Sequence, residues 1–162
     1  MRNFTWNKHF LSSTYTISEN GKELGHLKSN NLFSTSTDAK LMENEYEFVS
    51  QSWLNQNTKV FKTGQADPIA KINFNNFRSK AEIIYKDEVY KLKFLDIWQT
   101  RWQISKNDKC VLKSKKSSLS GGKAEIDNDL SELLLIALYA SNYFYTIGFL
   151  LVIIVIVLVI SN

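Results

Sequence analysis

The chain has 162 residues and a net charge of +4, with 20 Lys and Arg against 16 Asp and Glu. This weakly basic balance does not favour a nucleic-acid-binding protein, and the single cysteine, Cys110, excludes an intramolecular disulfide scaffold. Together with an N-terminus that has no apolar signal-peptide run, the composition predicts a reducing compartment. Every charged residue precedes Leu133, which leaves about 130 residues for one domain with its own core.

Residues 1–126 are predicted to form short β-strands, because apolar and aromatic side chains alternate between turn signals that recur about every ten residues. The clearest hairpin joins residues 14–17 to residues 23–27. Its turn contains Asn20-Gly21, a pair that supplies the two positive φ values of a type I′ turn. The twist of such a turn matches that of the flanking strands, so this hairpin is specified locally.

A second hairpin is predicted from residues 81–85 and 89–94, with its turn near Asp87-Glu88. The first hairpin also has an echo, because the pattern I-S-x-N-[G/D]-K-x-[L/V] occurs at residues 17–24 and again at residues 104–111. Repeated hairpins of this kind are typical of a closed or rolled sheet. We therefore expect a mainly β fold, an antiparallel β-barrel or roll.

The segment from residue 113 to residue 123 is basic and rich in Ser and Gly, without an apolar period. Its lysines could contact the phosphates of anionic lipids, and the alternative is a flexible, solvated loop. The candidate lipid-contact residues are Lys113, Lys115, Lys116 and Lys123.

A helix is predicted to begin after this segment. Asp129 and Glu132 are spaced as in a capping box, with Asp129 as the N-cap, and both place negative charge at the positive end of the helix dipole. Calcium binding by the cluster of Asp127, Asn128, Asp129 and Glu132 is the alternative, but helix capping explains these residues without a metal. The first part of the helix, residues 129–141, is expected to be a buried core helix.

The uncharged tail is too long for one membrane span and too short for two. Residues 133–160 would make a straight helix of about 42 Å, whereas the hydrocarbon core of a bilayer is about 30 Å thick and needs about 20 residues. We therefore expect the tail to be divided between a protein core and a membrane, although the sequence leaves open whether residues 129–141 lie inside the barrel or in the span.

An aromatic cluster marks the expected point of division. Tyr143, Phe144 and Tyr145 are predicted to form a belt at the membrane interface. The domains are accordingly residues 1–145, a β domain that includes helix 129–141, and residues 143–160, a membrane segment. We expect a single pass with the β domain in the cytoplasm.

The sequence carries no recognisable catalytic or metal-binding constellation. The two histidines, His9 and His26, have no His, Cys or Asp neighbours at metal-ligand spacing, and Cys110 has no local signature of a nucleophile. The tryptophans are spread among the β segments and are more simply core anchors than nucleobase platforms. We expect no enzymatic activity, no cofactor, no metal and no nucleic-acid partner.

The layout resembles the tubby C-terminal-like superfamily, which includes the LURP-one-related proteins and the phospholipid scramblases. The resemblance covers about residues 10–145 and rests on the repeated hairpins and on the capped hydrophobic helix start at residues 129–135, DLSELLL. It implies a closed barrel of about a dozen strands around the C-terminal helix, and an association with lipids or membranes. The apolar extension at residues 147–160 is not part of that fold.

These observations favour a non-enzymatic, membrane-attached binding or scaffold domain. Its expected partners are the membrane, anionic lipid headgroups and a protein that the sequence does not identify. Three alternatives stay open: a lipid-handling protein of scramblase type, which only the resemblance implies; a plain tail-anchored β domain without a central helix; and a soluble protein whose whole tail is buried.

Overall fold

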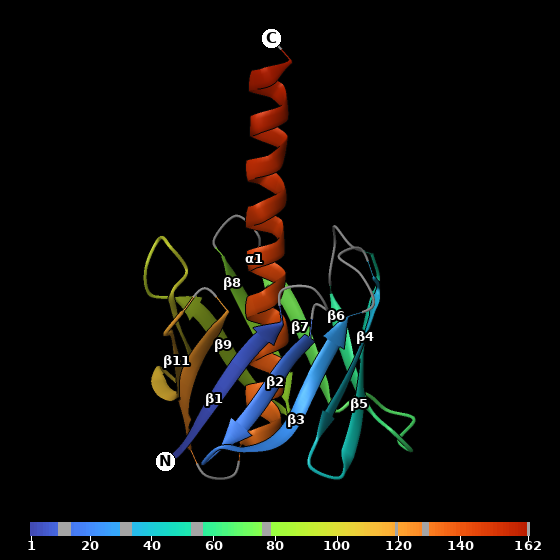
Figure 1. Cartoon of the computed structure of the whole chain (residues 1–162). Coiled ribbons are helices and arrows are strands. Elements are labelled where there is room, and N and C mark those ends of the chain that lie inside the picture. Colours follow the sequence, from blue (N-terminus) through green and yellow to red (C-terminus); the bar gives the residue numbers. More distant parts are fainter. Residues whose placement is uncertain are drawn as a thin grey trace.

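The computed structural model describes residues 1–9, 14–29, 34–52, 57–75, 79–118, 120–127 and 130–161. Within these residues it contains twelve strands and one long helix (Figure 1). In chain order they are β1 (Arg2–His9), β2 (Thr14–Glu19), β3 (Lys22–Ser29), β4 (Ser36–Leu41), β5 (Asn44–Ser50), β6 (Thr58–Lys62), β7 (Ala70–Asn75), β8 (Lys80–Tyr85), β9 (Glu88–Phe94), β10 (Arg101–Lys106), β11 (Lys109–Lys116), β12 (Gly121–Ile126) and α1 (Ser131–Ile160).

The strands form a closed antiparallel barrel, as the hairpin pattern predicted. Each strand pairs with the next along the chain, and β12 closes the barrel by pairing with β1, with Arg2 opposite Ile126 and Trp6 opposite Gly122. Closure leaves no unpaired sheet edge, so none of these strands is a template for aggregation.

Local turn chemistry explains the predicted hairpins. Asn20 and Gly21 both have positive φ, and so do the turn pairs Lys86-Asp87 and Asn107-Asp108. Two successive positive φ values define a type I′ turn. The β2–β3 hairpin and the echoed β10–β11 hairpin are therefore confirmed, and the β8–β9 turn lies one residue earlier than predicted.

The basic segment differs from the expectation of a loop. Residues 109–116 and 121–126 are the paired strands β11 and β12, and only residues 117–120 connect them. Leu112, Ser114 and Lys116 alternate with outward-facing lysines. This alternation is strand periodicity, but a small Ser and a Lys at inward positions hide it in the sequence.

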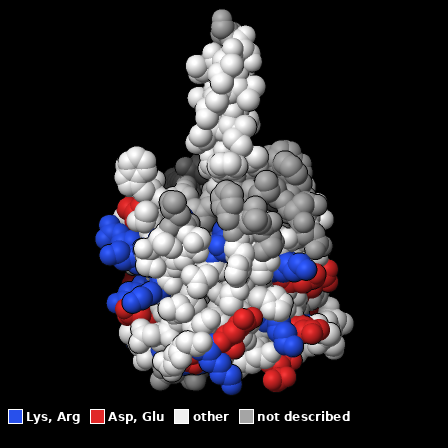
Figure 2. Space-filling view, viewed as in Figure 1, with Lys and Arg blue, Asp and Glu red and all other residues white. Residues whose placement is uncertain are grey.

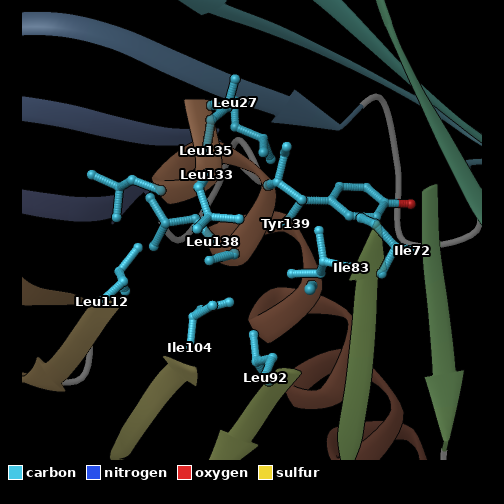
Figure 3. Close-up of a cluster of buried hydrophobic side chains, with 14 of the residues drawn as sticks. Leu27, Ile72, Ile83, Leu92, Ile104, Leu112, Leu133, Leu135, Leu138 and Tyr139 are labelled. Atoms are coloured by element: carbon cyan, nitrogen blue, oxygen red, sulfur yellow. The ribbon is translucent and has the colours of Figure 1, made fainter. Parts of the chain in front are cut away.

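Helix α1 occupies the axis of the barrel and leaves it at one end (Figure 1). Its residues from Leu133 to Ser141 are all buried, on every side of the helix. A helix that is apolar all round must be surrounded on all sides, and here the inward faces of the strands surround it (Figure 3). The fully buried residues of the wall include Leu27, Ile72, Ile83, Leu92, Ile104 and Leu112.

A polar side chain of the helix, that of Tyr139, contacts the wall where β5 ends and β6 begins. The ring of Tyr139 stacks on Phe48, with 4.5 Å between the ring centroids. Its hydroxyl lies 2.8 Å from the Ser50 hydroxyl and 3.2 Å from that of Thr58. A buried hydroxyl without partners would destabilise the core, so this pairing fixes the rotation of the helix against β5 and β6.

The helix start differs from the predicted capping box. The helix begins at Ser131, Leu130 is the cap residue, and no side chain caps it; Asp129 lies outside the described residues. Glu132 does not reach back to the cap. Its carboxylate instead accepts hydrogen bonds from Tyr46 and Tyr85 on the barrel wall.

The enclosed helix gives a stability prediction. Replacing Leu134 or Leu138 with Asp places an unpaired charge in the core, which costs several kcal/mol. We expect the β domain of either variant to lose its near-ultraviolet circular dichroism in detergent. Val155→Asp, on the exposed part of the same helix, is the control and is expected to keep the native spectrum. A native spectrum for Leu134→Asp would contradict the enclosure of this residue by the barrel wall.

Candidate functional site

The C-terminal half of α1, from Ile147 to Ile160, projects out of the barrel as an apolar segment, which we call the rod. Phe144 is the last fully buried residue of the helix, with 4% of its surface exposed, whereas Phe149 is 59% and Ile160 is 79% exposed. Figure 2 shows charged residues on the barrel body and none on the rod. Within the described residues, α1 is the one helix that is long and apolar enough to cross a membrane. An exposed surface of this kind indicates a membrane or partner interaction.

The rod is short for a bilayer. From Ile147 to Ile160 it would extend about 21 Å, compared with a hydrocarbon core of about 30 Å. Starting the span at Tyr143 gives about 27 Å, but those first residues lie within the end of the barrel. The barrel end must therefore approach the membrane closely if the rod is to cross it.

The predicted aromatic belt needs correction at two of its three residues. Tyr143 and Phe144 are buried, 5% and 4% exposed, because their rings pack against Phe74 at the inner face of β7. Phe144 also contacts Phe94 of β9 edge-on. These two rings close the top of the protein core and are not presented to lipid.

Tyr145 is the belt residue that stays at the barrel end. It is partly buried, and its hydroxyl donates to the backbone carbonyl of Gln99 at 2.7 Å. The ammonium of Lys116 lies 3.6 Å from the centroid of the Tyr145 ring, a cation–π geometry. Lys116, predicted to contact lipid, is thus turned inward against the helix.

A second lysine faces inward at the same end. Lys8 donates from its ammonium to the Asn142 side-chain carbonyl at 3.1 Å, and the Tyr15 hydroxyl donates to the same oxygen at 3.0 Å. Burial lowers the pKa of Lys8, and burial followed by repulsion from Lys8 lowers the pKa of Lys116. The helix therefore leaves the barrel through a polar, positively charged collar.

The other three predicted lipid-contact lysines lie on the outside of the barrel. Lys113 pairs with Glu125 at 2.9 Å, which neutralises it. Lys115 and Lys123 are exposed and stand directly opposite each other on β11 and β12. Two like charges in register repel each other, so this outward pair is the strongest candidate for an anionic ligand among the four.

At the far end of the barrel Glu132 is the centre of a polar cluster. Its carboxylate accepts from Tyr46 at 2.6 Å and also from Tyr85, and lies 4.0 Å from the Lys62 ammonium and 3.9 Å from that of Lys86. Burial alone would raise the pKa of Glu132, but the tyrosine hydrogen bonds, followed by the charges of the two lysines, outweigh it and hold the pKa below its usual range. The cluster fixes the first turn of α1 to strands β5 and β8 of the wall.

An open cavity of about 710 Å³ lies beside this cluster. It lies beside the connection between β6 and β7 and the turn between β8 and β9. β6 and β7 pair over only three residues, Thr58 to Val60, so their pairing has ended at this point. Its lining includes Lys62, Lys71 and Lys86 together with Glu132. The cavity is large enough for a small polar molecule, and lysines outnumber acidic residues in its lining.

Sequence reasoning missed the Glu132 cluster. Tyr46 and Tyr85 lie 86 and 47 residues away from Glu132 in the chain, so only the closed barrel brings them together. The side chains set aside as non-catalytic have ordinary contacts: His9 bonds to Thr16, and the Cys110 thiol faces its own strand at Leu112.

No known protein family, curated protein or solved structure matches the chain in the comparisons made. Membership of the tubby C-terminal-like superfamily therefore stays a prediction.

The Glu132 cluster predicts a specific pH dependence. Because the folded-state pKa of Glu132 is lowered, its ionised form stabilises the fold above the unfolded-state pKa of about 4.3, and this contribution disappears as the pH falls through the folded-state value. Glu132→Gln should cost about 1–3 kcal/mol at neutral pH. The difference in Tm from the parent should vanish at strongly acidic pH.

Thermal melts between neutral and acidic pH test this expectation. Glu82→Gln, at an exposed position of β8, is the matched control and should melt like the parent at every pH. A Tm deficit of Glu132→Gln that persists unchanged in acid would show that the carboxylate charge is not the stabilising feature.

Proposed function

We propose that the chain is a non-enzymatic binding or scaffold domain that is attached to a membrane through the projecting part of α1. The observation that carries this proposal is the exposed, uncharged run from Phe149 to Ile160. Exposing this apolar surface to water costs a free energy of about 25 cal/mol per Å². In hydrocarbon the same surface is favourable, and the backbone groups of the helix are already hydrogen-bonded to one another.

Two of the three alternatives disagree with the structure, and the third is less favoured. Burial of the whole tail is inconsistent with the exposed residues after Phe149, and a tail anchor without a central helix is inconsistent with the burial of residues 133–141. A scramblase-type activity needs a polar track for lipid headgroups through the bilayer. From Ile147 to Ile160 the helix has no polar side chain, which favours an anchor over a lipid conduit.

We propose that the β domain faces the cytoplasm. Lys8 and Lys116 lie at the end of the barrel where the helix emerges, and basic residues beside a span favour the cytoplasmic side. The lone thiol of Cys110, without any possible disulfide partner in the chain, is also typical of a reducing compartment.

The anchor proposal is tested by truncation. A chain that ends at Thr146 keeps the barrel and the enclosed helix but loses the rod, so we expect it to move from the membrane fraction to the soluble fraction with an unchanged near-ultraviolet spectrum. A full-length Val155→Leu, Val157→Leu variant preserves the apolar character and should stay in the membrane. A folded truncation that still pellets with membranes would sink the proposal.

Anionic headgroups are the proposed lipid partner of the outward pair Lys115 and Lys123. Each lysine held near an anionic leaflet contributes about 1 kcal/mol, and the contribution is screened by salt. We expect the chain that ends at Thr146 to bind vesicles rich in phosphatidylserine more tightly than neutral vesicles, and its double variant Lys115→Gln, Lys123→Gln to lose most of that difference at low salt.

Lys113→Gln is the matched control, because its charge is already paired with Glu125. It should leave the preference for anionic vesicles unchanged. If the double variant kept the full preference as well, the lipid-facing charges would have to lie elsewhere on the barrel.

A further inference from the structure

The connection between β9 and β10 presents two large apolar side chains to solvent. Ile97 is 88% exposed, more than any residue of the projecting rod, and Trp98 is 79% exposed. Leu95, at the start of the same connection, is 46% exposed. An exposed Trp beside an exposed Ile is unusual on a domain whose other described tryptophans, Trp6 and Trp102, are 2% and 1% exposed.

This connection lies at the end of the barrel where α1 emerges (Figure 1). Successive strands run in opposite directions, so the β9–β10 connection shares its end with the β11–β12 connection, opposite the end where the helix begins. The contacts agree, because Tyr145 of the emerging helix donates to the carbonyl of Gln99, and the Lys116 amide donates to that of Thr100 at 2.8 Å.

The connection is also held in one conformation from within. The Asp96 carboxylate accepts from the Thr100 amide at 2.9 Å and hydroxyl at 3.0 Å, and from the Arg101 amide at 2.9 Å and guanidinium at 3.3 Å. The Gln99 amide donates to the Asp96 carbonyl. These polar groups of the loop are thus hydrogen-bonded to one another, whereas the apolar side chains of Ile97 and Trp98 face the solvent.

The length of the rod indicates what surrounds the side chains of Ile97 and Trp98. A rod of about 21 Å is shorter than a hydrocarbon core of about 30 Å, so it can cross only if the bilayer thins around it and the barrel end sits in the membrane interface. The β9–β10 connection would then lie at headgroup depth. Trp is the residue enriched at that depth, since its ring prefers the interface between apolar and wet regions.

We propose that Ile97 and Trp98 form a second membrane contact, a preformed loop that inserts into the interface of the bilayer in which α1 is anchored. This inference rests on the proposed function. The loop and the helix would hold the barrel at two points, which fixes its tilt on the membrane as well as its attachment.

The test places an environment-sensitive fluorophore at single cysteines of the full chain, in a Cys110→Ser background. Ile97→Cys reports on the loop. Val155→Cys reports on the rod, and Met42→Cys, exposed in the turn at the opposite end of the barrel, is the aqueous control. Each variant is reconstituted in phosphatidylcholine nanodiscs, with and without lipids that carry a shallow spin-label quencher.

We expect the Ile97 and Val155 probes to emit at shorter wavelength than the Met42 probe, and the shallow quencher to act most strongly on Ile97. If the Val155 probe is in lipid while Ile97 behaves like Met42, the loop proposal is overturned and the anchor stands. If Val155 is also in water, both proposals fail.

A second readout needs no label. Lipids brominated near the headgroup should quench part of the native tryptophan emission, and Trp98→Phe should remove most of that quenching. A blue shift of the Ile97 probe that grows with the number of chains per nanodisc, without lipid quenching, would assign the loop to a second copy of the chain and overturn the proposal.

Discussion

The whole structure depends on filling the inside of the barrel. A barrel of eight strands can be filled by its own side chains, but the diameter grows with the number of strands, and twelve strands leave room for a helix. Residues 133–144 of α1 fill that space on all sides. The wall residues therefore have their packing partners in the last element of the chain, and neither the barrel nor the buried helix is complete without the other.

One continuous helix meets two different surroundings, and its polar residues mark where the change occurs. The enclosed part carries Glu132, Tyr139 and Asn142, each with a partner on the wall. Beyond Thr146 the helix contains no polar side chain until Ser161. Both parts are rich in apolar residues, but only the enclosed part carries polar side chains with partners on the wall, and these contacts set the depth at which the helix sits in the barrel.

Local signals predicted the hairpins, and the length of the tail predicted that it is divided. The type I′ turns at Asn20-Gly21 and Asn107-Asp108 are coded by neighbouring residues, and a sequence shows such signals directly. The aromatic cluster was misread at Tyr143 and Phe144, because an aromatic ring suits both a membrane interface and a packed core. Partners from distant strands, such as Tyr46 and Tyr85 for Glu132, depend on barrel closure and have no local signal.

The order of the elements has a consequence for how the chain folds. The wall closes through β1 and β12, with Arg2 opposite Ile126, and the element that fills the barrel follows both. Such non-local closure is slow, because the entropy of a long loop is lost before the contacts that repay it are made. During synthesis, the inward faces of β1 to β12 stay without their core until α1 leaves the ribosome. Filling of the barrel and synthesis of the projecting apolar rod therefore coincide, because both depend on the same helix.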